Sequence, residues 1–114
     1  MPDQGDIVLV PVPFTDLSSQ KRRPVIVVFN NSYNQKMADV IVVSMTSNPV
    51  ASAYSFAITS ADLESGTLNR PGQVRVDKIC TLAQGIVIKT FGRVGLPVLK
   101  RIRTILQSII DAKP

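Results

Sequence analysis

The chain has 114 residues, enough for one domain with a modest core but too few for two. Its 13 Lys and Arg against 8 Asp and Glu give a net charge of +5, and a basic excess of this size favours polyanionic partners such as RNA, DNA or an acidic peptide. Because it has one cysteine and no histidine, the chain alone can form neither a disulfide, nor a Cys/His zinc site, nor a histidine-dependent catalytic triad.

The apolar residues are spread over short runs, none of which approaches the length that crosses a bilayer. The first residues, Met1-Pro2-Asp3-Gln4, lack the basic start and the apolar stretch of a signal peptide. We therefore expect a cytoplasmic protein that does not associate with membranes.

Three apolar runs in the first half of the chain predict strands over 7–12, 25–29 and 40–45. Pro11 in the first run indicates an edge strand or a strand end, because proline cannot donate to the ladder. The other two runs are continuous, which is typical of strands buried on both faces. The polar segment 14–22 predicts a loop, and Asn30-Asn31-Ser32 has the composition of a turn.

The second half of the chain predicts further strands and one helix. Residues 54–59 and 73–79 alternate between polar and apolar types, 86–94 supplies a last short strand, and 62–72 is expected to be a loop with one helical turn. From Gly95 the apolar residues follow helical spacing, with Pro97 in the first turn, where proline is tolerated. The residues on this apolar face are Val98, Leu99, Ile102, Ile105, Leu106, Ile109 and Ile110.

Several short strands closed by one helix favour a mainly β fold, with a small, strongly bent antiparallel barrel and a C-terminal α-helix laid on the sheet. No internal repeat, low-complexity tract or linker divides the chain. We therefore expect a single domain over residues 1–114.

Three consecutive cations, Lys21, Arg22 and Arg23, stand just before Pro24 and the second apolar run. Adjacent positive charges repel one another, so their grouping at the mouth of a buried strand indicates a place that receives an anion. The planar fork of an arginine side chain suits phosphate oxygens in particular, because it donates two parallel hydrogen bonds.

The residue types that are absent narrow the possible chemistry. Without histidine, no two-histidine ribonuclease mechanism is possible within the chain, and the eight carboxylates are scattered singly rather than in a two-metal cluster. The chain has no Walker loop and no Gly-x-Gly-x-x-Gly motif. Cleavage of RNA by its own 2′-hydroxyl suits the remaining arginine, threonine, serine, tyrosine and lysine side chains. The substrate then supplies the nucleophile, and the protein need only orient the sugar and neutralise charge on the phosphate.

The order of the motifs adds to this reading. The chain opens with Gly5-Asp6 and an apolar strand, continues through a polar loop to Gln20, reaches Arg23-Pro24 and an aliphatic run, and ends its third predicted strand in a threonine. This order resembles the MazF/PemK/Kid family, the toxin halves of bacterial toxin–antitoxin pairs, over most of the chain. The resemblance implies an SH3-like small barrel of the type that these toxins share with CcdB.

In that family an arginine and a threonine, corresponding to Arg23 and Thr46, form the catalytic centre of a sequence-specific endoribonuclease. The resemblance implies an enzyme that needs no metal and no cofactor. It implies attack by the 2′-hydroxyl of single-stranded RNA and products with 2′,3′-cyclic phosphate and 5′-hydroxyl ends. Contacts to RNA are then expected from residues near this pair and from a later segment: Gln20, Lys21, Arg22, Ser47, Asn48 and Lys78.

The segment around Arg75 and Asp77 is similar to one in which the Kid branch of the family has an arginine and an aspartate proposed as catalytic, so these two residues are possible helpers. The chain departs from the family pattern at three positions. Lys78 replaces a common glutamine, Cys80 a common arginine, and Ser18 the histidine of the Kid branch. A scheme that needs that histidine cannot operate here.

Each candidate residue also has a structural alternative. Arg23 is alternatively a surface charge, and Thr46 a strand-ending residue of high β propensity. Arg75 and Asp77 lie at i, i+2 on one strand, where a surface ion pair is an equally good reading. Lys78 is alternatively a solvated charge.

The expected partners are single-stranded RNA, a second copy of the chain in a homodimer, and a small acidic antitoxin whose extended tail competes with RNA for the basic surface. The homodimer is also favoured by the apolar composition and by the aliphatic face of the terminal helix. Two other functions remain open: a CcdB-like toxin that binds DNA gyrase without cleaving anything, and an inactive relative that only binds nucleic acid.

Overall fold

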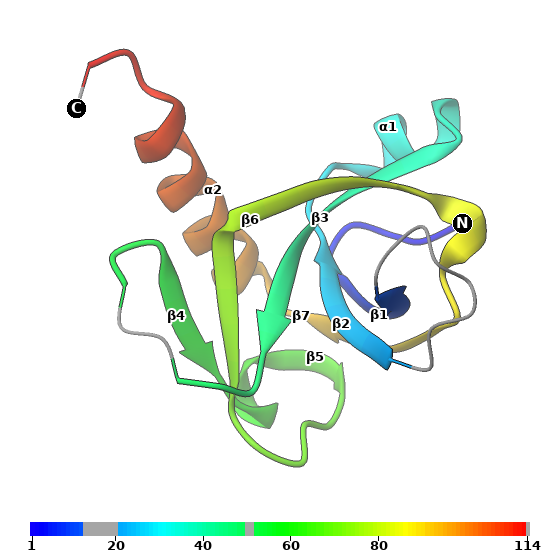
Figure 1. Cartoon of the computed structure of the whole chain (residues 1–114), viewed down its shortest axis with the longest axis horizontal. Helices are drawn as coiled ribbons and strands as arrows, with labels where there is room; N and C mark the ends of the chain where they lie inside the picture. The colour runs from blue at the N-terminus through cyan, green and yellow to red at the C-terminus, as the bar shows by residue number, and fades with distance from the viewer. Residues whose placement is uncertain (13–20, 50–51, 114) are drawn as a thin grey trace.

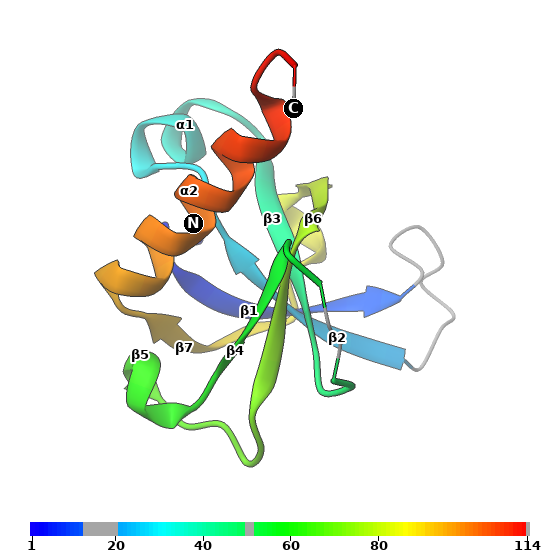
Figure 2. The same cartoon turned by 90° about the vertical axis from the view of Figure 1, so that its left-hand side faces the viewer.

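The computed structural model describes residues 1–12, 21–49 and 52–113. The seven strands in this part of the chain form one antiparallel sheet in the order β4-β6-β3-β2-β1-β7-β5, and the sheet curls into a half-barrel with α2 beside it (Figures 1 and 2). The predicted mainly β fold with a C-terminal helix is thereby confirmed. The elements are β1 (Asp6–Val12), β2 (Lys21–Val27), α1 (Asn31–Lys36), β3 (Asp39–Thr46), β4 (Ser55–Ile58), η1 (Ser60–Asp62), β5 (Leu63–Gly66), β6 (Gly72–Ala83), η2 (Gln84–Ile86), β7 (Lys89–Val94) and α2 (Leu96–Ile110).

Two apolar clusters lie on opposite faces of the sheet, because alternate residues of a strand point to opposite sides. Val25, Ile26 and Val27 are each at most 1% exposed, which confirms the predicted burial on both faces for this last part of β2, while Phe29 beyond it is exposed. The helix-side core contains the buried residues Ile7, Ile26, Val43, Met45, Phe56, Ile58, Val74, Val76, Val94, Val98 and Ile102. The far-side core contains Val8, Val10, Val25, Val27, Val40, Val42 and Leu82.

The opening Gly5-Asp6 pair has a structural role. Gly5 has φ +90°, a left-handed conformation that glycine adopts without a Cβ clash. The carboxylate of Asp6 is almost fully buried and accepts a 3.0 Å hydrogen bond from Nε of Arg93 on β7, while Nη2 of Arg93 reaches Asp3 at 3.1 Å. These bonds raise the pKa of the Arg93 guanidinium and fasten the N-terminal segment to β7.

The β1–β2 hairpin is longer than predicted. Val10, Pro11 and Val12 pair with Arg23, Arg22 and Lys21, so the three cations belong to β2 and not to the loop expected over 14–22. Pro11 lies beyond Leu9, the last residue of β1 that pairs with β7. It therefore occupies a strand segment with only one neighbour, in agreement with the predicted strand end.

Helix α1 replaces the turn predicted at Asn30-Asn31-Ser32. Asn30 is its N-cap, and the side chain of Asn30 accepts a 3.0 Å hydrogen bond from the backbone N–H of Tyr33. At the other end, Nε2 of Gln84 donates to the carbonyl groups of Asn34, Met37 and Asp39 at 2.8–3.1 Å. Phe29, predicted as strand, follows the end of β2 and makes an edge-on contact with the ring of Tyr33 at 5.0 Å.

The segment 62–72 is also more ordered than a loop. A capping box between Thr59 and Asp62 caps the N-terminus of the short helix η1. Strand β5 then pairs with β7. The predicted last strand begins later than expected, since Gln84–Ile86 forms the helix η2 and β7 starts at Lys89.

Helix α2 begins after Gly95, as the change of period predicts. Val98 and Ile102 are buried against the sheet, whereas Ile110 near the end is 72% exposed. The guanidinium of Arg101 lies 4.3 Å from the centre of the Phe56 ring, which attaches the helix to β4. No helix in the described ranges has the length and apolar character needed to span a membrane.

Candidate functional site

The strand register brings the two principal candidate residues to one end of the sheet. Val25 of β2 pairs with Ser44 of β3, and the pairs before it are Ile26 with Val43 and Val27 with Val42. Two residues beyond the Val25–Ser44 pair are Arg23 on β2 and Thr46 on β3. Arg23 and Thr46 therefore lie at the same end of these two neighbouring strands.

Strand β6 adds to the same end from the other side of β3. Thr46 pairs with Gln73, and Ser44 pairs with Arg75. Because paired residues of neighbouring strands point to the same side of a sheet, Arg23, Thr46 and Arg75 share the face of the far-side core, beyond the point where its apolar residues end. Strands β6, β3 and β2, which carry these three residues, are consecutive neighbours in the sheet (Figure 1).

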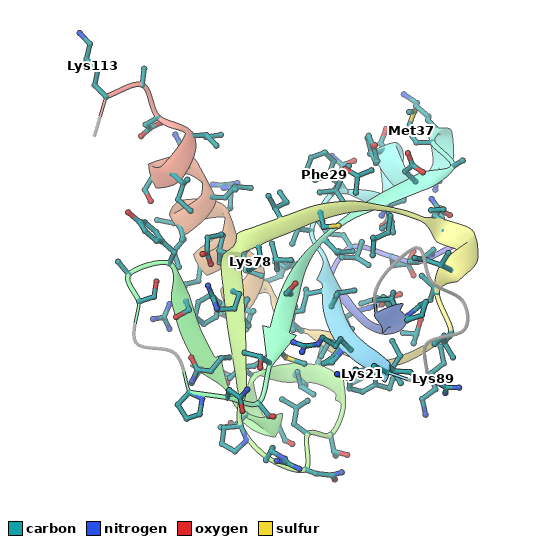
Figure 3. The ribbon with its side chains drawn as sticks, in the orientation of Figure 1. Lys21, Phe29, Met37, Lys78, Lys89 and Lys113 are labelled. Carbon is teal, nitrogen blue, oxygen red and sulfur yellow. The ribbon has the colours of Figure 1, made fainter. Side chains whose placement is uncertain are left out.

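A bulge of three residues bends β6 just after Arg75. Ser44 of β3 pairs with Arg75, but the next residue, Val43, pairs with Ile79, so three residues of β6 between them have no partner on β3. Figure 1 shows the resulting sharp turn of β6, and Figure 3 shows Lys78 beside it. Oγ of Ser44 donates to the Lys78 carbonyl at 3.5 Å. The bulge exposes Asp77, Lys78 and Ile79 at the surface.

Arg75 and Asp77 form a two-pronged ion pair. Nε of Arg75 donates to Oδ1 of Asp77 at 3.2 Å, and Nη2 donates to Oδ2 at 3.1 Å. These bonds lower the pKa of Asp77, with Arg75 as the main cause, so the carboxylate is ionised at neutral pH. Arginine has five N–H donors, and two are used here. Within the described part of the chain the other three have no partner and can bind an anion.

The hydroxyl group of Thr46 is also available. Its Oγ1 accepts a 3.2 Å hydrogen bond from the backbone N–H of Asn48, which leaves the hydroxyl proton to be donated to a ligand. Ser47 and Asn48 are exposed beside it, and Lys21, Arg22 and Arg23 are exposed along the neighbouring strand. Gln20 and Ser18 lie outside the described residues.

Cys80 is not an activated nucleophile. It is partly buried against the far-side core, and burial raises the pKa of its thiol. A raised pKa disfavours the thiolate, which is the reactive form. This agrees with the reading of Cys80 as a small apolar residue.

Several hollows lie on the described surface. A cavity of 140 Å³ is bordered by Thr46 and Ser47. Sequence reasoning missed it because the segment that forms its other wall, 68–71, belongs to the stretch 62–72, which was expected to be a loop with one helical turn. A larger hollow of 610 Å³ runs along α2 next to Phe29 and Tyr33, away from every predicted site residue that the structure describes. In the described part of the chain, no group of three or more Asp, Glu or Cys side chains could hold a metal ion.

Solved structures with similar folds come from bacterial toxins. An endoribonuclease in complex with its cognate antitoxin from a mycobacterial species has a TM-score of 0.78 and 24% identity over 100% of both chains. The MazE–MazF complex of Deinococcus radiodurans has a TM-score of 0.75 and 19% identity, covering 98% of this chain and 97% of the other. The Mycobacterium tuberculosis toxin MazF-mt6 has a TM-score of 0.75 and 17% identity, covering 96% and 99%. At these identities the likeness shows the fold.

None of the curated proteins matches the chain in sequence. Residues 3–110 do match a protein family described as the PemK-like, MazF-like toxin of type II toxin–antitoxin systems. This match covers nearly all of the chain, from the segment before β1 to the last residue of α2. The chain therefore belongs to the PemK/MazF-like family of type II toxin–antitoxin toxins.

Proposed function

We propose that this member of the family is a metal-independent, sequence-specific endoribonuclease that cleaves single-stranded RNA. The observation that supports the proposal is the register of β2, β3 and β6, from which Arg23, Thr46 and Arg75 are inferred to share one face of three neighbouring strands. Two guanidinium groups and a hydroxyl at one place are suited to a phosphate whose negative charge increases during the reaction.

In the proposed reaction the 2′-oxygen of the substrate bonds to phosphorus and the bond from phosphorus to the 5′-oxygen breaks. One proton leaves the 2′-hydroxyl and one is taken up by the 5′-oxygen, so the products are a 2′,3′-cyclic phosphate and a 5′-hydroxyl. Arg23 and the unused donors of Arg75 bind the non-bridging phosphate oxygens, and Thr46 donates its hydroxyl proton to one of them. Asp77, whose lowered pKa makes it a weak base, holds Arg75 in place.

Binding of the rest of the RNA is proposed to involve Lys21 and Arg22 along β2, Gln20 before them, Ser47 and Asn48 after β3, and Lys78 at the bulge. The net charge of +5 supports this assignment, because most of the affinity for nucleic acid comes from neutralised phosphates. Affinity is then expected to fall steeply with salt.

The protein is further proposed to act in the cytoplasm as a homodimer inhibited by a small acidic antitoxin. Solved relatives include an endoribonuclease with its cognate antitoxin and a MazE–MazF complex. The homodimer is supported by aliphatic side chains that the described chain leaves exposed: Ile79 at 43%, Ile109 at 40% and Ile110 at 72%.

Product analysis tests the proposed function. Purified protein is incubated with a long single-stranded RNA, with and without EDTA, and the ends of the fragments are analysed. Cleavage in EDTA that leaves 2′,3′-cyclic phosphate and 5′-hydroxyl ends is expected. Strict dependence on Mg²⁺, or fragments with 3′-hydroxyl ends, would overturn the proposal.

A further inference from the structure

We propose that the 140 Å³ cavity bordered by Thr46 binds one RNA base, a pyrimidine, next to the phosphate held by Arg23 and Thr46. The inference rests on the proposed ribonuclease function and deepens it by naming a specificity pocket. Its walls are mostly apolar, with Pro24, Met45, Leu68, Pro71 and Phe91 among the lining residues. Thr46, Ser47, Asn69, Arg70 and Gly72 complete the lining.

The size of the cavity favours a single ring. Pockets for drug-sized ligands have volumes of roughly 300–1,000 Å³, whereas a cavity of about 150 Å³ holds one benzene ring. The 140 Å³ here is close to the second figure. A pyrimidine base therefore matches the volume of the cavity, which the fused rings of a purine would exceed. The flat apolar faces of Phe91 and the two prolines are suited to stacking against a base.

Polar groups at the rim can identify the base. Asn69 and Arg70 are exposed, and within the described residues their side chains make no hydrogen bond or ion pair. The amide of Asn69 offers both a donor and an acceptor. Uracil and cytosine each present donors and acceptors on their Watson–Crick edge, so one amide can address either base.

The cavity lies within reach of the proposed phosphate site because the two share the end of β3. Met45 points to the helix-side core and lines the cavity, while Thr46, the next residue, points to the opposite face with Arg23. Consecutive residues of a strand are only about 3.3 Å apart along its axis. A nucleotide placed across this strand end can therefore put its phosphate on one side and its base on the other.

Gly72 keeps the cavity open. A Cβ atom on this buried glycine would lie 2.8 Å from Sδ and 3.1 Å from Cγ of Met45, which is too close. Met45 is 4% exposed and packs on its other side in the helix-side core, so the cavity is the space into which it can move. Gly72→Ala is thus a way to fill the cavity without removing any polar group.

Methyl NMR of methionine tests the inference without relying on cleavage. The chain has three methionines, and only Met45 lines the cavity, so Met1 and Met37 are internal controls. Protein labelled with ¹³C at the methionine methyl groups is titrated with the 3′-monophosphates of uridine, cytidine, adenosine and guanosine. We expect a saturable shift of Met45 alone with at least one pyrimidine nucleotide, and no comparable shift with the purines.

Two variants sharpen the test. Asn69→Ala, an exposed loop substitution, should weaken the response on the order of tenfold and relax the base preference at one position next to the cleaved bond, because one amide contact to the base edge is lost. Gln35→Ala, an exposed amide on α1, should change neither. Gly72→Ala should abolish the Met45 response, while Gly85→Ala, whose Cβ has no atom within 4 Å, should keep it.

The two proposals fail in different ways. If Met45 stays unmoved at millimolar nucleotide while the protein cleaves RNA in EDTA, the cavity assignment is wrong and the proposed function stands. If Met45 responds to a pyrimidine but no RNA is cleaved, the pocket is right and the function is wrong. Equal shifts with purines would overturn the preference for a single ring.

Discussion

Arg75 and Asp77, two residues apart on β6, make two parallel hydrogen bonds of 3.2 and 3.1 Å across the start of the bulge. The predicted alternative for these residues, a surface ion pair, is therefore present. Because the pair leaves three N–H groups of Arg75 unused, it is also compatible with phosphate binding. Its geometry suggests that Asp77 acts by orienting Arg75.

A double-mutant cycle separates the two roles. Arg75→Ala is expected to slow RNA cleavage on the order of tenfold or more, and Asp77→Asn by less, since the asparagine oxygen still accepts a hydrogen bond from Nε. If Asp77 acts only through Arg75, the double variant is no slower than Arg75→Ala alone. Losses in kcat that multiply in the double variant would instead give Asp77 a role of its own in the reaction.

The pH dependence of stability follows from the lowered pKa of Asp77. A carboxyl group with a lowered pKa in the folded state adds stability above its unfolded pKa, near 3.9, and loses that contribution as the pH falls through the folded value. The two side chains are 23% and 32% exposed, so the contribution is expected to be below about 1 kcal/mol. Urea unfolding of the wild type and Asp77→Asn should therefore differ slightly at pH 7 and converge at strongly acidic pH. A difference that grows on acidification would contradict the assignment.

Arg23 and Thr46 are predicted to be required for cleavage and dispensable for folding. Each supplies a donor to the developing charge, and loss of such a donor typically costs about 3 kcal/mol, on the order of a hundredfold in rate. We therefore expect kcat to fall about this much in Arg23→Ala and Thr46→Ala, while circular dichroism spectra remain unchanged. Thr46→Ser, which keeps the hydroxyl, should retain most activity.

Matched controls for these variants lie elsewhere on the surface. Arg103→Ala removes an exposed arginine from α2, and Thr90→Ala an exposed threonine from β7. Both should cleave RNA at nearly the wild-type rate. If Arg23→Ala or Thr46→Ala does so too, that residue has only its structural role, as a surface charge or a strand end.

The homodimer is predicted from exposed aliphatic surface near the end of α2. Light scattering at micromolar concentration should give about twice the chain mass of 12.4 kDa. Introducing charge with Ile109→Asp and Ile110→Asp together should shift the protein toward monomer. Leu96→Asp, which places the same charge at an exposed position at the other end of α2, should leave the dimer intact. Wild-type protein that is strictly monomeric and still cleaves RNA would exclude a shared site.

The parts of the fold that were predicted are those encoded in local patterns. Continuous apolar runs predicted the buried strands β2 and β3, and the change to helical spacing at Gly95 predicted α2. The elements that were missed depend on distant partners. Helix α1 is closed by Gln84, about 50 residues away in sequence, and β5 exists as a strand because β7 lies beside it.

The candidate site was likewise predicted in its local features and missed in those that depend on distant partners. The residue types of Arg23 and Thr46, and the place of Thr46 at the end of β3, could be read from the sequence, whereas Arg23 lies inside β2 and not before it as predicted. Their convergence depends on the pairing register, which no local pattern encodes. The bulge that turns β6 at Arg75 was also invisible, since Val74 and Val76 simply continue an alternating pattern. The cavity beside Thr46 depends on residues 68–71, which meet the end of β3 from a distant part of the sequence.

Gly66 provides a last test, of the pairing that the sequence did not reveal. It has φ +86°, and a Cβ atom there would lie 2.5 Å from the carbonyl oxygen of Phe91 and 2.8 Å from Cα of Gly92. These are backbone atoms of β7, which cannot move aside as a flexible side chain can. Gly66→Ala should therefore strain the backbone and push β5 from β7, at a cost of roughly 1–3 kcal/mol in the free energy of unfolding.

Gly85→Ala, with open space around its Cβ, is the control and should change the free energy of unfolding by less than about 0.5 kcal/mol. Urea denaturation of both variants measures the difference. Equal stabilities would show that β5 does not pack against β7 as closely as the structure has it.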